Sequence, residues 1–189
     1  ALAGLALLPA ARAATVEESV AELQQAWEVI NYKTPAAEKE KKFEALAARA
    51  HKVTESFAGR AEPLVWEGII LSSWGGAKGG LGALGLVKQA KVLYEQAIQI
   101  DVNVLDGSAY NSLGVLYYKV PGWPIAFGDK AKAKDLLQKA LAINPKGIDA
   151  NYFFADYLVE TGEAPKAVAH LEKVMQAAPR CLLYTSDAA

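Results

Sequence analysis

The stretch AKDLLQKALAINPKGIDANYFFADYLVETGEAPKAVAHLEKVMQAAP, residues 133–179, contains one pattern twice. The pattern places a small residue, a leucine, a second small or apolar residue and a proline in order, and its copies lie 34 residues apart: Ala133, Leu137, Ala140 and Pro145, then Ala167, Leu171, Val174 and Pro179. A period of about this size is typical of stacked helical hairpins. Small residues let neighbouring helices approach closely, and proline ends a helix because it cannot continue one. The stretch therefore predicts the second helix of two successive units.

The segment before each copy carries a matching apolar helical face. Its positions are Tyr110, Leu113, Gly114 and Tyr117 in one unit, and Asn151, Phe154, Ala155 and Leu158 in the next. Glycine inside a helix costs roughly 1 kcal/mol relative to alanine. Gly114 therefore predicts a site where a partner helix leaves no room for a side chain. Two matched helices in register favour a repeat over ordinary amphipathic packing.

Further helices are predicted towards the N-terminus. Thr15 and Glu18 form a capping box before a helix at 16–32, and the Thr34-Pro35 pair begins a second helix. Another pair is expected to begin at Glu62, with its second helix at 86–100. Strand-like alternation is absent from the sequence, so we predict an all-α fold.

These features resemble the tetratricopeptide repeat, whose second helix carries small, large and small residues and a terminal proline. The stretch from Glu62 to Pro179, with LGVLY at 113–117 and VPGWP at 120–124, is similar to short exported bacterial proteins of this type. The resemblance implies a short right-handed solenoid of antiparallel helix pairs. We expect a divergent N-terminal pair at 14–60 and three repeats at about 61–104, 105–147 and 148–180.

The two ends of the chain do not fit the repeat. Residues 1–13 combine an apolar run, Leu2 to Leu8, with Ala11-Arg12-Ala13, which resembles a signal-peptidase site. We predict a signal-peptide remnant and a mature periplasmic chain that starts near Ala14; the alternative is a short buried or interfacial helix. Residues 181–189 resemble translated sequencing-adapter read-through and are expected to be non-native. The alternative there is a genuine apolar tail that covers the last helix.

A glycine-rich segment, GGAKGGLGALG at 75–85, is expected to lie between the two helices of one unit. Phosphate-binding loops need a preceding strand and a Lys-Ser or Lys-Thr pair that leads into a helix. Both are missing here, because a helix precedes the segment and Leu86-Val87 follows it. The segment is therefore interpreted as a flexible or closely packed connection.

A second segment, 120–129, adds seven residues to the turn of one hairpin relative to the next. Its two prolines limit the conformational freedom of the turn, so it is expected to hold one shape. Trp123, Ile125 and Phe127 are too apolar for a passive surface loop. They either fold back as a lid on their own repeat or offer a contact surface.

Composition excludes several classes of function. A net charge of −1 with no basic run disfavours a nucleic-acid binder and a binder of strongly anionic membranes. One cysteine permits no internal disulfide and no thiolate metal cluster, and the two histidines lack ligand partners at helical spacing. We therefore predict no enzyme activity, no metal, no cofactor and no stable membrane anchor. The oligomeric state is left open.

Family resemblance implies a concave groove that binds a protein or peptide partner. Side chains one helical step from the core of each first helix are expected to line it: Glu67 and Trp74, Asn111 and Tyr118, Tyr152 and Asp156, with Trp123 and Phe127 from the inserted turn. This aromatic and acidic set suits an extended apolar or proline-bearing segment, or a basic one held by Glu67 and Asp156. The alternative is that these aromatic rings pack on one another and expose little.

A second function stays open beside the protein-binding scaffold. An exported repeat protein with an extra proline-bearing turn is also similar, more loosely, to the T-component of tripartite ATP-independent periplasmic transporters. That resemblance implies an accessory role in solute transport, with a small apolar molecule as the ligand.

Overall fold

A computed structural model of the chain describes residues 14–177. The signal-peptide and non-native-tail predictions concern residues outside this range. The described chain forms eight α-helices and one short π-helical turn: α1 (Val16–Glu28), η1 (Val29–Lys33), α2 (Ala36–Ser56), α3 (Ala61–Lys78), α4 (Ala83–Ile100), α5 (Val104–Lys119), α6 (Lys130–Ile143), α7 (Ile148–Glu160) and α8 (Ala164–Gln176). The all-α prediction is confirmed.

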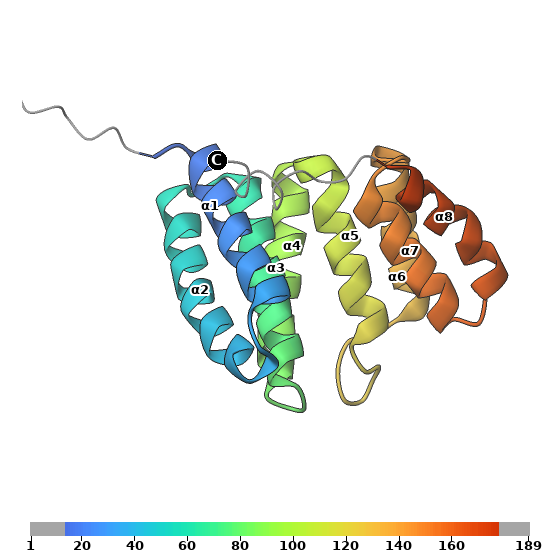
Figure 1. The fold of residues 1–189 in the computed structure, drawn as a ribbon, viewed down its shortest axis with the longest axis horizontal. Coiled ribbons are helices and arrows are strands. Elements are labelled where there is room, and N and C mark those ends of the chain that lie inside the picture. The colour runs from blue at the N-terminus through green and yellow to red at the C-terminus, as the bar shows by residue number, and fades with distance from the viewer. Residues whose placement is uncertain (1–13, 178–189) are drawn as a thin grey trace, which may run out of the picture.

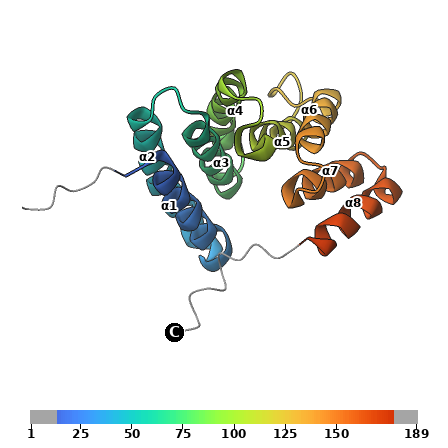
Figure 2. The ribbon, with the colours of Figure 1, turned by 90° about the horizontal axis from the view of Figure 1, so that it is seen from above.

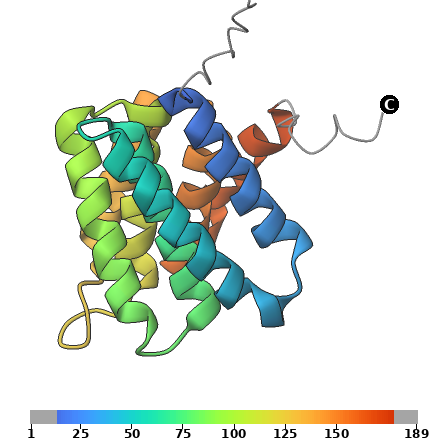
Figure 3. The same ribbon diagram turned by 90° about the vertical axis from the view of Figure 1, so that its left-hand side faces the viewer.

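Consecutive helices pack as antiparallel pairs, and the pairs stack side by side (Figures 1 and 3). The first helix of each later pair also contacts the first helix of the pair before it. Helix α3 packs on α1, α5 packs on α3, and α7 packs on α5. Figure 2 shows that the stack is curved, with α1, α3, α5 and α7 on its inner side and α2, α4, α6 and α8 outside. The inner helices therefore define a concave face.

The N-termini of α1 and α6 are capped by side-chain hydrogen bonds. The Thr15 side chain accepts from the Glu18 backbone N–H at 3.2 Å, and the Glu18 carboxylate accepts from the Thr15 N–H at 2.8 Å, so the capping box is confirmed. Asp129 caps α6 in the same way, with its carboxylate accepting from the N–H groups of Ala131 and Lys132. These caps satisfy donors that have no partner inside the helix.

The repeat positions of α6 lie in the core, with Ala133 and Leu137 fully buried. Gly114 faces them across the α5–α6 interface: a Cβ at Gly114 would lie 2.8 Å from Leu137 Cγ and 3.3 Å from the Ala133 carbonyl oxygen. The prediction of a helix contact too close for a side chain is confirmed. Gly68 is similar, since its Cβ would lie 2.5 Å from a ring carbon of Tyr94, and no pattern in the sequence pointed to this contact.

The equivalent positions of α8 are only partly buried. Ala167 packs in the core, but Leu171, which corresponds to the buried Leu137, is 39% exposed. The physical reason is that α8 packs on α7, and no further described helix covers its other side.

The glycine-rich connection is shorter than predicted. Helix α3 continues to Lys78 and α4 begins at Ala83, so only residues 79–82 link the two helices. Gly75 lies inside α3 and is buried, where a Cβ would meet Val87 of α4 at 3.2 Å. Close packing against α4 thus lets α3 continue through its glycines, although glycine has a low helix propensity.

The apolar side chains of the inserted turn do not share one environment. Phe127 folds back, with its ring edge-to-face against Tyr117 at a centroid distance of 5.4 Å. Trp123 is 90% exposed, and Ile125 is also exposed. The turn is held by backbone hydrogen bonds from Gly128 N–H to the Pro121 carbonyl at 2.9 Å and from Asp129 N–H to the Tyr117 carbonyl at 2.8 Å.

Alanine substitutions should separate these two environments. Phe127→Ala is expected to lower the free energy of unfolding by about 1.5–3 kcal/mol, because it removes a packed aromatic ring. Trp123→Ala is expected to change it by no more than about 0.5 kcal/mol, as for other exposed sites. Urea denaturation of both variants checks this, and equal losses would contradict the described turn.

Candidate binding groove

A cavity of about 660 Å³ opens on the concave face. One wall comes from α1 and η1, the floor from α3, α4 and α5, and the opposite wall from α7. This arrangement follows the curvature of the stack in Figure 2. Cavities of this size are large enough for a drug-sized ligand or a few side chains of a peptide.

The wall at α1 and the adjacent floor are aromatic. The Trp27 indole N–H donates to the Ser73 hydroxyl at 2.8 Å, which fixes the ring against α3. Trp66 and Tyr32 meet Trp27 edge-to-face at centroid distances of 6.0 Å and 5.8 Å. Tyr32, which follows α1 in the π-helical turn, is 65% exposed. These rings offer flat apolar area with polar edges.

The opposite wall, on α7, carries a second aromatic pair. Tyr152 and Phe153 lie edge-to-face at 5.2 Å, and Tyr152 is 48% exposed. Both rings line the cavity together with Ile148. A ligand in the groove would therefore meet aromatic rings on both sides.

The floor contains polar groups. The Ser72 hydroxyl lies 3.1 Å from the Tyr94 hydroxyl and donates to the Gly68 carbonyl at 2.8 Å. Burial raises the pKa of Tyr94, so its phenol stays protonated. Asn111 is only 4% exposed, and its Oδ1 has no hydrogen-bond partner in the part of the chain that the structure describes. A buried acceptor without a donor costs free energy, which makes this oxygen a candidate contact for a ligand.

The charged side chains that line the cavity are both acidic. Glu28 lies at the end of α1 and Asp149 in the first turn of α7. The Gln24 amide donates to the Glu28 carboxylate at 3.2 Å. No lysine or arginine of residues 14–177 is among the lining residues. The groove is thus aromatic and acidic.

Of the side chains predicted to bind a partner, the structure brings Asn111 and Tyr152 together in this cavity. Glu67 is buried elsewhere, with its carboxylate 2.9 Å from His51 Nδ1. Trp74 is half-buried and has the Lys78 ammonium 5.9 Å from its ring centroid. Neither residue lines the cavity, and the residues immediately before them, Trp66 and Ser73, do so instead.

Tyr118 and Asp156 lie outside the cavity and bind one another. The Tyr118 hydroxyl donates to the Asp156 carboxylate at 2.7 Å, and the Lys119 ammonium lies 2.9 Å from the same carboxylate and also pairs with Glu160. Desolvation acts to raise the pKa of Asp156, but hydrogen bonds from Lys119 and Tyr118 outweigh it and hold that pKa below its usual value. This cluster, Tyr118–Lys119–Asp156–Glu160, joins α5 to α7.

Trp123 and Phe127 stay in the inserted turn and do not line the cavity. Their role in partner binding, like that of Glu67, Trp74, Tyr118 and Asp156, stays a prediction. The lining residues Trp27 and Trp66 were not among the residues predicted to bind a partner. No sequence pattern marked Glu28 or Tyr32 as a groove residue, because the α-helical period is interrupted where α1 passes into the π-helical turn.

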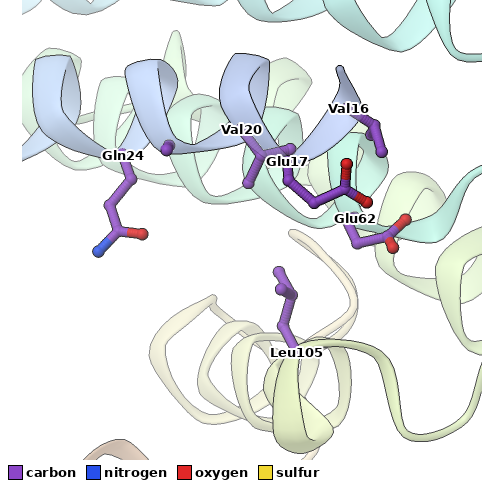
Figure 4. Close-up of a pocket in the computed structure, with 7 residues that line it drawn as sticks. Val16, Glu17, Val20, Gln24, Glu62 and Leu105 are labelled. Atoms are coloured by element: carbon purple, nitrogen blue, oxygen red, sulfur yellow. The ribbon is translucent and has the colours of Figure 1, made fainter.

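A smaller cavity of about 290 Å³ lies where the first pair meets the others (Figure 4). Leu105, which has a positive φ of 46° in the turn that opens α5, lies opposite Val20 of α1. Arg60 pairs with Glu62 at 2.6 Å and with Glu17 at 3.2 Å beside this cavity. The Arg60–Glu17 pair links α1 to the start of α3.

Neither membrane-spanning nor metal-binding features occur in the described chain. From residue 14 to residue 177, no helix is long and apolar enough to cross a membrane. Within the same range, no group of three or more His, Cys, Asp or Glu side chains is placed to hold a metal ion.

Comparison with known proteins identifies the repeat in the C-terminal part of the chain. Residues 125–186 match the family model described as tetratricopeptide repeat. Among solved structures, a thermophilic tetratricopeptide-repeat protein of Thermus thermophilus is 13% identical, with a TM-score of 0.46 over 89% of this chain and 94% of that one. MamA is 18% identical, with a TM-score of 0.38 over 72% of this chain and 88% of that one. No curated protein matches.

Proposed function

We propose that this chain, which carries tetratricopeptide-repeat sequence at residues 125–186, is a non-catalytic scaffold that binds a protein or peptide partner in its concave groove. Tetratricopeptide repeats typically mediate protein–protein interaction, and no enzyme family matches the sequence. The observation that carries the proposal is the cavity on the inner helices, with exposed aromatic side chains on both walls. Exposed rings with a polar edge are enriched where proteins bind one another.

Affinity capture with the full chain tests this proposal. Wild-type protein is expected to retain a partner that Tyr152→Ala retains at least about tenfold less well, as for an interface aromatic ring. Trp123→Ala tests the inserted turn separately, since its ring is exposed outside the groove. Equal capture by all three proteins would exclude the groove, and a loss confined to Trp123→Ala would assign binding to the inserted turn.

A second candidate function is the binding of a small apolar molecule as an accessory component of a periplasmic transport system. The volume of about 660 Å³ favours it, because small-molecule sites commonly enclose about 300–1,000 Å³. Native mass spectrometry of the purified protein separates the two candidates. A retained small mass supports the second candidate, and its absence together with captured protein supports the first.

The scaffold is proposed to act in the periplasm, on the basis of the signal-peptidase-like Ala11-Arg12-Ala13 motif. Expression of the full-length gene followed by cell fractionation tests the location. Protein in the periplasmic fraction with an N-terminus near Ala14 is the expected result. Cytosolic protein that keeps residues 1–13 would overturn it.

A further inference from the structure

We infer that the groove selects an extended peptide segment that carries a lysine or arginine side chain among apolar residues. This inference rests on the proposed function and specifies the partner that the same site takes. Three features of the cavity carry it: the sign of its charges, its aromatic rings and the buried amide in its floor.

The charges that line the cavity are negative on both walls, from Glu28 and Asp149. Asp149 lies in the first turn of α7, where a carboxylate is favoured by the helix dipole in any case. Glu28 is the last residue of α1, where the helix dipole does not favour a carboxylate. Its side chain is half-buried and accepts a hydrogen bond from Gln24. A cleft lined by one sign of charge concentrates the opposite sign, so this groove attracts a cation and disfavours an acidic segment.

The aromatic rings of the cavity are available to a cation. In the described chain, lysine ammonium groups lie within 6 Å of five ring centroids: those of Trp74, Tyr110, Tyr117, Tyr118 and Phe127. None of these rings lines the cavity. Trp27, Tyr32, Trp66 and Tyr152 do line it, and their faces can attract the ammonium or guanidinium of a ligand.

The floor of the cavity contains a hydrogen-bond acceptor without a donor among the described residues. Asn111 Oδ1 is buried, has no partner among residues 14–177, and belongs to a side chain that lines the cavity. A backbone N–H of an extended segment, or a guanidinium N–H, would satisfy it once the Asn111 amide turns toward the cavity. A carboxylate would not, because it carries acceptors only. A guanidinium or ammonium group, which is a cation that carries N–H donors, matches all three features.

Binding of synthetic peptides to the full-length protein tests the inference. Three acetylated and amidated peptides share the same leucine and proline residues and differ at two central positions, which hold Arg, Gln or Glu. We expect the Arg peptide to bind about tenfold more tightly than the Gln peptide and the Glu peptide to bind most weakly, because ion pairs and cation–π contacts both contribute. The advantage of the Arg peptide should shrink as salt is raised from about 50 mM to about 500 mM.

Variants that remove one negative charge test which carboxylate causes the preference for the Arg peptide. Glu28→Gln is expected to weaken the Arg peptide about 3- to 10-fold and to leave the Gln peptide unchanged. Glu44→Gln is the matched control, because Glu44 is exposed on α2, which contributes no residue to the cavity. It should leave the affinity of both peptides unchanged.

Different failures have different meanings. Equal binding of the Arg and Gln peptides, with both weakened by Tyr152→Ala, would overturn the cation preference and leave the scaffold function intact. Equal effects of Glu28→Gln and Glu44→Gln would also overturn the inference. If no peptide binds at millimolar concentration, the inference fails, and the proposed function fails with it only if affinity capture is also independent of Tyr152.

Discussion

Replacing Gly114 with leucine is expected to lower the free energy of unfolding by about 1–3 kcal/mol or more, because it forces a side chain into a close helix–helix contact. Even a Cβ at this position would lie 2.8 Å from Leu137 Cγ and 3.3 Å from the Ala133 carbonyl oxygen. Leu137 is fully buried and the carbonyl belongs to helix α6, so neither can move without displacing the helix. Urea denaturation and thermal melting measure the effect.

Gly76→Leu is the matched control for this substitution. Gly76 lies on the exposed face of α3, and a Cβ there would meet no atom within 4 Å. Leucine has a higher helix propensity than glycine, so this variant is expected to gain about 0.5–1 kcal/mol. A Gly114→Leu protein that unfolds like the wild type would contradict the α5–α6 packing described above.

Tyr118→Ala is expected to cost about 3–5 kcal/mol, whereas Tyr152→Ala should cost no more than about 1 kcal/mol. Tyr118 is buried, packs edge-to-face on Tyr157 at a centroid distance of 5.6 Å, and donates to Asp156. Tyr152 is half-exposed on the groove wall. The sequence pattern had assigned both tyrosines to one binding surface, where both substitutions would spare stability.

Tyr118→Phe separates the ring from its hydroxyl. This variant keeps the packing on Tyr157 and removes the donor to Asp156, so it is expected to lose about 1.5–3 kcal/mol, the usual range for a hydrogen bond to a charged group. Denaturation curves of the three tyrosine variants check these values. A Tyr118→Ala protein as stable as Tyr152→Ala would mean that Tyr118 is not a core residue.

The paired-helix fold could be predicted because its core positions repeat. Ala133, Leu137 and Gly114 each have a packing role that depends on side-chain size alone, and size is visible in the sequence. The capping box at Thr15 was equally local. Features of this kind need no knowledge of distant contacts.

The lining of the groove was harder to predict because it depends on helix rotation. Helix α3 is apolar on most of its circumference, so no clear polar boundary marks which residues face the groove. Glu67 was predicted to line the groove, but it is buried beside His51, while the neighbouring Trp66 lines the cavity. On α5 and α7 only one predicted residue of each helix lines the cavity, Asn111 and Tyr152, while Tyr118 and Asp156 lie outside it.

The positions of the tryptophans give the groove an internal optical reporter. Of the four tryptophans in the chain, Trp27 and Trp66 line the cavity. Both indoles lie where a bound segment would exclude water from their rings, so occupancy of the groove will change their emission. Trp123, being 90% exposed, contributes a solvent-like background that Trp123→Phe removes. Affinities for unlabelled peptides can therefore be read from intrinsic fluorescence, without a dye that would add its own charge to an acidic groove.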